Sequence, residues 1–416
     1  MTGSQLVRPV PSHPPVLPVS AFTLGRIPRI TFGAGTVAQL PGIVRGHGSR
    51  ALLVTGGSSL AASGRLAQVT AGLEAAGVAV VGLVEIHDEP SPQAIDAAVA
   101  ANRAAAVDVV LGIGGGSVLD TAKAIAGLLD GGTSVMDHLE GLPGYRPYAG
   151  TSVPFVAVPT TAGTGSEATR NAVISERGPQ GYKRSFRDER LVAADAVLDP
   201  DLLAGADRVR IAANGMDAVT QLLEAYVSAK AGPLTDALAL DGLASARDGL
   251  LAWHADPDGP DAPTARARMA YAALLSGICL AHAGLGAVHG LASPLGAQLP
   301  IPHGIACGTT LSGITTANVA ALEARDPGSP ALGKYAVLGR LLARLPEAAP
   351  DDEARAALVG VLATWTTTLA IPGLGSYGLD ATGIPAIVAD ARGSSMRTNP
   401  VVLTDDELAA VLRAAL

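Results

Sequence analysis

The fold is decided by the segment Val109-Val110-Leu111-Gly112-Ile113-Gly114-Gly115-Gly116-Ser117, in which a continuous apolar run meets a cluster of glycines. Such a run is typical of a strand that is buried on both faces of a parallel sheet. A helical pattern begins at Val118. Glycines let a backbone approach an anion closely, and the free N–H groups at a helix start point toward it. The segment predicts a strand, a phosphate-binding turn and a helix, although a tight turn alone would also use glycines.

Strands and helices alternate on both sides of this segment. Apolar runs at 50–56, 78–84 and 153–158 predict three more strands, and a short strand or hairpin is expected within 22–35. Helical patterns rich in alanine lie between the runs at 50–56 and 78–84 and between 78–84 and the strand that begins at Val109. Alternation of this kind predicts βαβ units and a parallel sheet with helices on both faces.

The pattern changes near residue 200, beyond which Ala/Leu-rich helical periodicity replaces the β-branched runs. We therefore expect an α/β dinucleotide-binding domain over 21–200 and an all-α metal and substrate domain over 201–416. The active site is expected in the cleft between them. The first twenty residues contain five prolines, so 1–20 is predicted to be a disordered arm.

The composition excludes several classes of protein. The 416 residues carry 29 basic and 37 acidic side chains, a net charge of −8, with no basic stripe that nucleic acid would require. A run without charged residues spans 269–322, but glycine and proline interrupt it, so no membrane span is expected. Cys279 and Cys307 are interpreted as small buried hydrophobic residues. With no signal-peptide pattern, a cytoplasmic location is predicted.

A second turn rich in small residues follows the strand predicted at 153–158. Its sequence is Pro159-Thr160-Thr161-Ala162-Gly163-Thr164-Gly165-Ser166-Glu167. Two such turns at the carboxyl ends of parallel strands form a crevice of the kind in which doubly wound sheets bind nucleotides. Together they predict a dinucleotide site.

The helical half contains a candidate metal site. Asp217 and Gln221 are four residues apart on a predicted helix and share a face, although a carboxylate near a helix start also interacts favourably with the helix dipole. His289 and His303 lie in the charge-free run, where a neutral imidazole needs a hydrogen bond or a metal as partner. His282, in the same run, is interpreted as a core histidine.

In this order, the motifs resemble those of the iron-containing (group III) alcohol dehydrogenases, a superfamily that also holds maleylacetate reductases and glycerol dehydrogenases. The matching motifs are Gly114–Ser117 with Asp120, Pro159–Glu167 with Asn171, Gly215–Tyr226, His289–Gly296 and Pro302–Gly304. The resemblance covers roughly residues 22 to 400. It implies a dinucleotide-binding domain, a helical metal-binding domain, and a homodimer or larger homo-oligomer.

The resemblance also implies roles for particular residues. The cofactor contacts would be Gly115, Gly116, Ser117, Asp120, Thr160, Thr161, Thr164, Asn171 and Lys183. Asp217, His289 and His303 match three of the family's four metal ligands. The fourth ligand, usually histidine, is Gln221 here, and a second histidine implicated in proton transfer is replaced by Ser293. An amide oxygen is a weak donor for transition metals, so Fe²⁺ or Zn²⁺ is expected to bind weakly or not at all.

We therefore predict an oxidoreductase that transfers hydride between NAD(P)H and a small aldehyde or ketone, with His289, His303 and Ser293 as catalytic residues. After the strand at 50–56, Gly56, Gly57 and Ser58 stand where NAD-preferring enzymes place an acidic residue, so NADP(H) is expected to be accepted.

Three alternatives remain at this point. Arg187 and Arg397 would suit the anionic substrate of a maleylacetate-reductase-like enzyme. A dehydroquinate-synthase-like lyase would use a related scaffold, and a dinucleotide-binding pseudoenzyme would account for Gln221 and Ser293.

Overall fold

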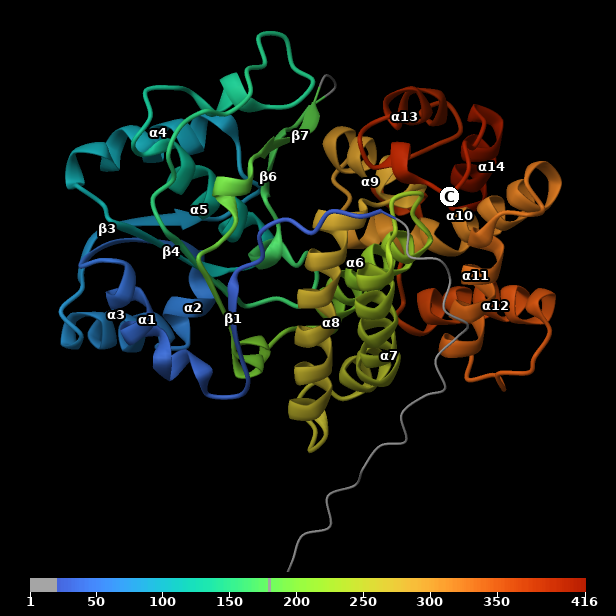
Figure 1. Cartoon of the computed structure of the whole chain (residues 1–416), viewed down its shortest axis with the longest axis horizontal. Helices are drawn as coiled ribbons and strands as arrows, with labels where there is room; N and C mark the ends of the chain where they lie inside the picture. The colour runs from blue at the N-terminus through green and yellow to red at the C-terminus, as the bar shows by residue number, and fades with distance from the viewer. Residues whose placement is uncertain (1–20, 179–180) are drawn as a thin grey trace, which may run out of the picture.

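The computed structural model describes residues 21–178 and 181–416, without the side chains of residues 58 and 59. The arm predicted at 1–20 therefore lies outside the described residues. A lobe built on a parallel sheet and a lobe of helices lie side by side along the long axis (Figure 1). The predicted fold class, an α/β domain followed by an all-α domain, is confirmed.

The sheet lobe is a doubly wound α/β structure. Its strands run in the order β1-β8-β5-β4-β2-β3, and every neighbouring pair is parallel. The elements are β1 (Arg29–Phe32), α1 (Leu40–His47), β2 (Arg50–Gly56), α2 (Ser58–Ala62), α3 (Arg65–Ala75), β3 (Ala79–Ile86), α4 (Pro92–Asn102), β4 (Val109–Gly114), α5 (Gly116–Leu128), β5 (Phe155–Pro159), β6 (Asn171–Glu176), β7 (Tyr182–Arg187) and β8 (Asp195–Leu198). The strands predicted at 50–56, 78–84, 109–114 and 153–158 correspond to β2, β3, β4 and β5.

The two faces of this sheet are buried by different helices. Leu52 and Val110 belong to the apolar cluster that contains α5 residues, whereas Leu53 and Leu111 join the cluster that contains residues of α1 and α3. Successive residues of a strand point to opposite faces, so each central strand must be apolar throughout. This requirement explains the continuous apolar runs in the sequence.

The antiparallel hairpin β6–β7 is absent from the sequence prediction. Its second strand, Tyr182–Arg187, contains four polar or charged residues, so its sequence lacks the apolar run by which the other strands could be recognised. Burial of Phe186, Ala172 and Ile174 against the α5 side of the sheet lobe holds the hairpin in place. The hairpin thereby carries Lys183 toward the helical lobe.

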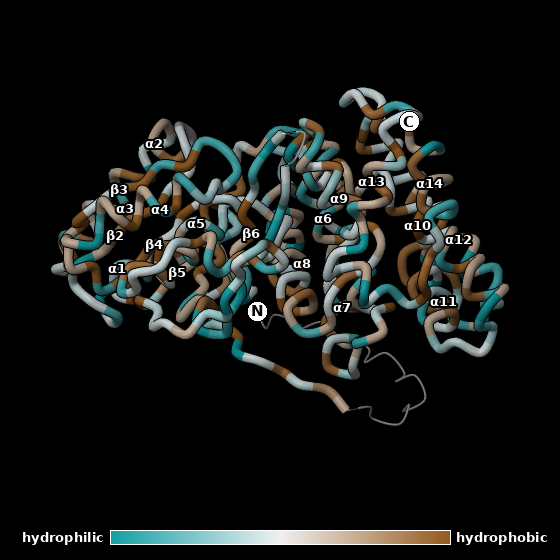
Figure 2. The backbone as a smooth tube through the Cα atoms, turned by 90° about the horizontal axis from the view of Figure 1, so that it is seen from above, coloured by the Kyte–Doolittle hydropathy of each residue, from teal (hydrophilic) through white to brown (hydrophobic). Residues whose placement is uncertain are grey.

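The helical lobe is organised around a buried central helix, α6. Its helices are α6 (Arg208–Val227), α7 (Pro233–Ala255), α8 (Ala262–Ala283), α9 (Ala287–Gln298), α10 (His303–Arg325), α11 (Pro330–Leu342), α12 (Asp351–Thr368), α13 (Ile384–Asp390) and α14 (Asp405–Ala414). Helices α7, α8 and α10 pack around α6. Figure 2, from above, shows the apolar and polar segments of both lobes.

Helix α10 has the length and mean hydropathy of a membrane span. Among the described helices, a second candidate arises only if α8 and α9 are taken together across a bend of 103°. In α10, 61% of the apolar window is buried inside the protein, where the helix packs against α6, α9 and α12. Its apolar character is therefore explained by its place in the core of the helical lobe.

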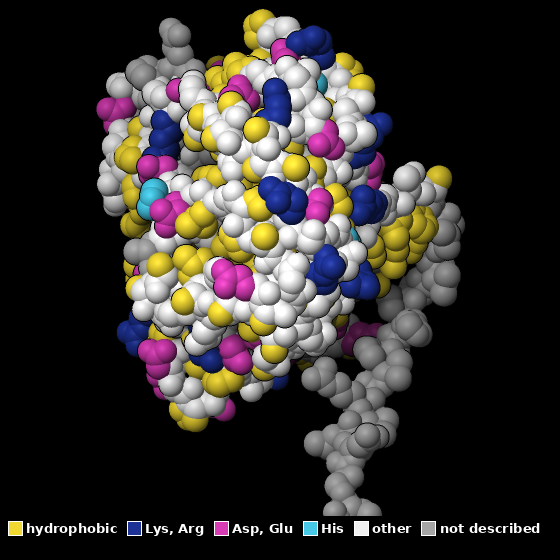
Figure 3. All heavy atoms as spheres, turned by 90° about the vertical axis from the view of Figure 1, so that its left-hand side faces the viewer, with side chains coloured by type: hydrophobic (Ala, Val, Ile, Leu, Met, Phe, Trp, Pro, Cys, Tyr) yellow, Lys and Arg dark blue, Asp and Glu magenta, His cyan; other side chains and the backbone are white. Residues whose placement is uncertain are grey.

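Charged side chains lie mainly on the outside of the protein. Figure 3 shows the outer end of the sheet lobe, where basic and acidic side chains are interspersed rather than gathered by sign. Positive and negative electrostatic potential therefore alternate over this face, and it carries no basic stripe.

Two glycine contacts fix the approach of segments that carry the site. Gly165 has φ +59° and touches α8, where a Cβ on Gly277 would lie 2.1 Å from the Gly165 carbonyl oxygen. A Cβ on Gly304, at the start of α10, would lie 2.0 Å from the Ala213 carbonyl oxygen of α6. Real Cβ atoms do not approach so closely, so these helices could not pack as they do with any larger residue.

Candidate active site

A cleft of about 1310 Å³ lies between the two lobes. From the sheet lobe it is lined by the glycine turn (residues 114–117), the threonine turn (residues 159–167) and the loop 87–90 after β3. From the helical lobe it is lined by His289, Ser293 and His303. The cleft therefore joins the two regions in which the sequence predicts a cofactor and a metal.

The glycine turn presents an uncapped helix start to the cleft. Helix α5 begins at Gly116, no side chain caps its N-terminus, and its first turn contains no acidic residue. A Cβ on Gly116 would lie 2.8 Å from Thr164, so the glycine lets the two turns touch. Free N–H groups and the positive end of the helix dipole favour a pyrophosphate there. These features fit the dinucleotide predicted from sequence.

Most of the predicted cofactor contacts line this cleft. They are Gly56, Gly115, Gly116, Ser117, Asp120, Thr160, Thr161, Thr164, Asn171 and Lys183. Gly57 is not among the lining residues, because its Cα faces His87, whose Nδ1 would lie 2.8 Å from an added Cβ. The side chain of Ser58 lies outside the described part of the structure. Arg65 and His87 also line the cleft, and the sequence analysis does not identify either of them.

Asp120 makes contacts with other parts of the sheet lobe. One carboxylate oxygen accepts a hydrogen bond from the Ser166 hydroxyl and lies 3.6 Å from the Lys123 ammonium. The other accepts from the Val173 N–H at 3.0 Å. Asp120 thus joins α5 to the threonine turn and to β6 at the lining of the cleft.

Lys123 is fully buried beneath the threonine turn. Its Nζ donates to the Ser166 carbonyl oxygen at 2.9 Å, to Thr169 Oγ1 at 2.9 Å and to the Asn171 carbonyl oxygen at 2.8 Å. Burial lowers the pKa of Lys123, although Asp120 and Glu167 raise it. The sequence analysis does not single out this residue, because a lysine three positions after an aspartate is common on an exposed helix.

Four side chains of types that can ligate a metal converge behind the cleft wall that His289 and His303 form. Donor atoms of Asp217, His289, His303 and Cys307 all lie within 4.8 Å of one another. Asp217 Oδ1 is 3.3 Å from His289 Nε2 and 3.7 Å from His303 Nε2. The structure therefore brings together three of the predicted ligands and adds a cysteine. We call these four residues the metal pocket.

Glu224 fixes the orientation of His289. It lies two helical turns after Asp217 on α6, and its Oε2 is 2.6 Å from His289 Nδ1. Its other oxygen accepts from the Val288 N–H at 2.7 Å. With Nδ1 held in this way, Nε2 is turned toward Asp217, as in metal sites where a carboxylate orients the ligating histidine. The helical spacing from Asp217 was visible in the sequence, but the pairing with His289 was not.

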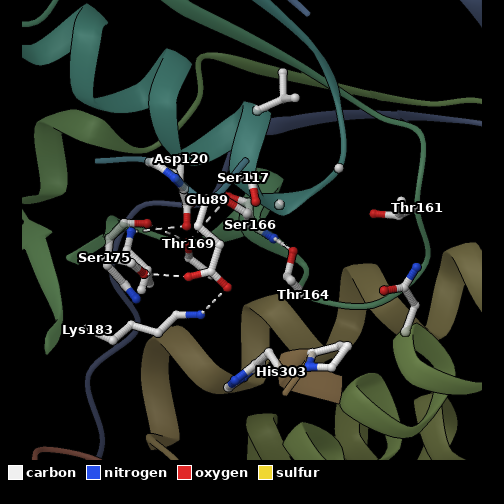
Figure 4. A pocket seen from close by; sticks show the side chains of 18 of the residues that line it. Glu89, Ser117, Asp120, Thr161, Thr164, Ser166, Thr169, Ser175, Lys183 and His303 are labelled. Atoms are coloured by element: carbon white, nitrogen blue, oxygen red, sulfur yellow. Dashed lines mark hydrogen bonds and ion pairs between the residues drawn. The ribbon is translucent and has the colours of Figure 1, made fainter. Parts of the chain in front are cut away.

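A partly buried ion pair borders the metal pocket on the sheet side. Lys183 Nζ donates to Glu89 Oε1 at 3.1 Å, and Ser175 donates to Glu89 Oε2 at 2.6 Å. Figure 4 shows Lys183 and Glu89 between the threonine turn and His303. Burial opposes ionisation of Glu89, but Lys183 and Ser175 outweigh it and lower the pKa of that carboxyl. Glu89 is thus an anion next to Lys183, and the sequence analysis missed it.

Comparisons with known proteins agree with this geometry. Residues 28–200 match the family described as iron-containing alcohol dehydrogenase, and residues 211–416 match the C-terminal domain of the Fe-containing alcohol dehydrogenase family.

The chain belongs to the iron-containing alcohol dehydrogenase family.

Individual relatives span nearly the whole chain. Alcohol dehydrogenase 4 of Saccharomyces cerevisiae is 31% identical over 400 residues, covering 95% of this chain and 99% of the yeast protein. Lactaldehyde reductase of Escherichia coli is 32% identical over 366 residues, covering 86% of this chain and 90% of that enzyme. The crystal structure of a 1,3-propanediol oxidoreductase superposes with a TM-score of 0.84 at 27% identity, covering 95% of this chain and all of the other. The chain is thus an oxidoreductase of the alcohol dehydrogenase type.

Gln221 departs from the family at the position of its fourth ligand. Its Oε1 accepts a hydrogen bond from Ser276 Oγ at 2.8 Å, and its Nε2 faces Asp217 Oδ1 at 3.3 Å. An amide NH₂ is a donor without a lone pair for a metal. The amide nitrogen of Gln221 therefore faces the metal pocket in this structure, and a weakened fourth ligand at this position stays a prediction.

The interpretation of Cys307 as a small core residue was incomplete. The thiol is fully buried, as expected, but its Sγ lies 3.8 Å from both Asp217 Oδ1 and His289 Nε2. Cys279 donates to the Thr235 carbonyl oxygen and is outside the metal pocket. Only one of the two cysteines is therefore purely a core residue.

The two histidines of the metal pocket differ in protonation. Burial lowers the pKa of His303 to about 4, although Asp217 acts in the opposite direction. Burial also disfavours the charged form of His289, but Cys307, Glu224 and Asp217 outweigh it and raise its pKa well above the usual value. His303 Nδ1 is buried without a hydrogen-bond partner in the described structure. A neutral His303 keeps a lone pair on Nε2 with which it can ligate a metal.

Proposed function

We propose that this enzyme transfers hydride between NAD(P)H and a small aldehyde or ketone at a divalent metal in the metal pocket. The observation that carries the proposal is that His289 and His303 line the same cleft as the glycine turn and converge with Asp217 behind its wall. A metal bound by these residues would supply Lewis-acid polarisation of the carbonyl group. The names of the relatives, alcohol dehydrogenase and lactaldehyde reductase, support a small alcohol and its carbonyl partner.

The residues of the chain have separable tasks in this reaction. The glycine turn binds the pyrophosphate and thereby positions the cofactor. Glu224 holds His289 in one tautomer and orientation. The His303 ring and the Ser293 side chain both line the cleft, and the Ser293 hydroxyl is proposed to hydrogen-bond a substrate and to pass its proton toward solvent.

NADP(H) is accepted as well as NAD(H) in this proposal. Gly56 lines the cleft without an acidic side chain, and Arg65 supplies a cation to the same cleft. Asp88 also lines the cleft, one strand farther out, and would disfavour a 2′-phosphate that approached it. The ratio of kcat/KM for NADPH to that for NADH measures which of these charges dominates.

The decisive test combines elemental analysis of the purified protein with turnover. NADH and NADPH oxidation is followed over a panel of small aldehydes and ketones, with and without added Zn²⁺, Fe²⁺ or Co²⁺. Turnover that requires metal supports the proposal. Quenching of cofactor fluorescence without turnover on any member of the panel would favour the pseudoenzyme alternative.

An anionic carbonyl substrate is a second candidate, favoured by Arg397. Its side chain is exposed, lines the cleft, and has no hydrogen bond or ion pair among the described residues. Arg187 also lines the cleft, but its guanidinium lies 3.6 Å from Glu140. An unpaired guanidinium suits a carboxylate or phosphate on the substrate.

The two arginines serve as a matched pair for testing this candidate. Arg397→Ala is expected to reduce kcat/KM at least tenfold on a carboxylated aldehyde while sparing a neutral one of similar size. Arg187→Ala is the control. Equal losses on both substrates in Arg397→Ala would point to cofactor binding or folding instead.

The enzyme assembles as a homodimer or larger homo-oligomer in this proposal, and acts in the cytoplasm. Within the described residues β1 pairs only with β8, and Ile30 and Phe32 on β1 are exposed. They border an apolar hollow of about 450 Å³ together with Tyr271. An open strand edge with apolar neighbours is a surface that a second copy can cover. A monomeric mass in light scattering would overturn this part.

A further inference from the structure

Cys307 occupies the place of a fourth donor in the metal pocket. Its Sγ lies 3.8 Å from Asp217 Oδ1, 3.8 Å from His289 Nε2 and 3.9 Å from His303 Nε2. The side chain is fully buried, and it lies one helical turn after His303 on α10. A core cysteine needs apolar neighbours, whereas this thiol faces three groups of the type that ligate transition metals.

The spacing of the donors is that of a tetrahedral metal site. Zinc bonds of about 2.0–2.3 Å in a tetrahedron place the donor atoms roughly 3.3–3.7 Å apart. Five of the six distances between the four donors lie between 3.3 and 3.9 Å, and the sixth, between the two histidines, is within 4.8 Å. A small contraction around a cation would therefore complete the site.

We propose that the Cys307 thiolate is the fourth protein ligand of the metal and replaces the histidine that Gln221 has displaced. The inference rests on the proposed function only in assuming that a divalent metal enters the metal pocket. Binding releases the thiol proton to solvent, and the Sγ lone pair then forms the bond to the cation. The carboxylate of Asp217 and this thiolate together balance the charge of a divalent ion.

The exchange of ligand changes the chemistry of the site. A thiolate is a soft donor and favours Zn²⁺ or Co²⁺ over Mg²⁺ or Mn²⁺, whereas an amide oxygen would not. His289, His303 and Gln221 line the cleft, but Asp217 and Cys307 do not. The two anionic ligands, Asp217 and Cys307, would therefore contact the metal from the side away from the cleft. Since four protein ligands complete a tetrahedral set, a substrate oxygen would have to enter as a fifth donor from the cleft side.

Cobalt substitution tests the assignment directly in the full-length protein. The apoprotein is loaded with Co²⁺, and its absorption spectrum is recorded in the near ultraviolet, where thiolate-to-cobalt charge transfer appears. The wild type and Cys279→Ser are expected to show this band at one equivalent of cobalt, and Cys307→Ser is expected to lack it. Cys279 is the matched control because it is the other buried cysteine and lies outside the metal pocket.

Affinity provides a second readout that does not require activity. Against a competing chelator, Cys307→Ser is expected to bind Zn²⁺ at least tenfold more weakly than wild type, and the double variant Cys307→Ser/Gln221→His to recover most of that loss. Failure of the wild type to retain cobalt, or a wild-type cobalt spectrum without the thiolate band, would overturn the assignment without any variant. A band that persists in Cys307→Ser would do the same.

The outcomes separate this inference from the proposed function. If the thiolate band is absent but NAD(P)H-dependent carbonyl reduction proceeds, the ligand assignment alone is overturned. If the band is present in a protein that turns over no carbonyl compound, Cys307 is a ligand and the proposed reaction is wrong.

Discussion

The glycine turn and the metal pocket face each other across one cleft but are built by different means. The glycine turn consists of four consecutive residues whose uncapped backbone N–H groups are proposed to bind the cofactor. The metal pocket consists of side chains from three helices. Its first and last members along the chain, Asp217 and Cys307, are 90 positions apart. A site made of backbone depends on local shape, whereas a site made of side chains depends on residue identity and on packing. Each therefore has its own weak points.

The largest expected effect comes from Lys123, whose side chain supports the threonine turn beside the glycine turn. Lys123→Met removes the cation that holds the threonine turn and leaves Asp120 and Glu167 unpaired. We expect the free energy of unfolding to fall by about 3–5 kcal/mol, the cost of breaking a buried pair from one side. Chemical denaturation measures it, with exposed Lys230→Met as control. A loss below about 1 kcal/mol would show that the threonine turn keeps its conformation without Lys123.

Glu167, in the threonine turn, makes the free energy of unfolding depend on pH. Burial raises the pKa of Glu167 to about 7, and Asp120 adds to the effect while Lys123 opposes it. Because the unfolded chain ionises first, stability falls as pH rises from about 4.5 to 7, by about 3 kcal/mol in all. Glu167→Gln is expected to flatten unfolding free energy over this range. An unchanged slope would mean that other groups dominate.

Glu224→Gln tests the metal pocket. The amide keeps the shape of the residue but places a neutral group, in place of an anion, beside His289 Nδ1. We expect metal affinity, measured against a competing chelator, to fall about 10–100-fold, as for other residues that orient metal ligands. Asp236→Asn, which disturbs a pair with Lys334 outside the metal pocket, is the control. Unaltered affinity would show that packing alone orients His289.

The smallest expected effect lies at the edge of the glycine turn region. An added Cβ at Gly56 would meet only Val118, at 3.5 Å, so Gly56→Asp can be accommodated. Its carboxylate would repel a 2′-phosphate and lower the ratio of kcat/KM for NADPH over NADH about tenfold, roughly 1.4 kcal/mol. An unchanged ratio would place the ribose elsewhere.

The sequence was most informative where structure follows from local pattern. β2, β4 and β5 are buried on both faces, and their apolar runs could be recognised without knowing their partners. β7 and β8 were not predicted. The first has three cations and a serine among its six residues, and the second has four residues and begins with Asp195. Such strands are defined by what they pair with, which the order of residues does not reveal.

The same limit applies to the site. Asp217, His289 and His303 could be found because their motifs are local. Glu89 could not, since its partner Lys183 is 94 positions away on a hairpin that was itself missed. Cys307 stands four residues after His303, a spacing that was available, but a cysteine in an apolar run has the pattern of a core residue.

The contact between Gly165 and Gly277 determines more than packing. It is one of the places where the two lobes touch backbone against backbone, as Gly163 and Asn214 also do. A methyl group added at Gly165 or Gly277 would push the sheet lobe and the helical lobe apart. Since a displacement of about 1 Å can cost a hundredfold in rate, neither position is expected to accept a larger residue without a loss of activity.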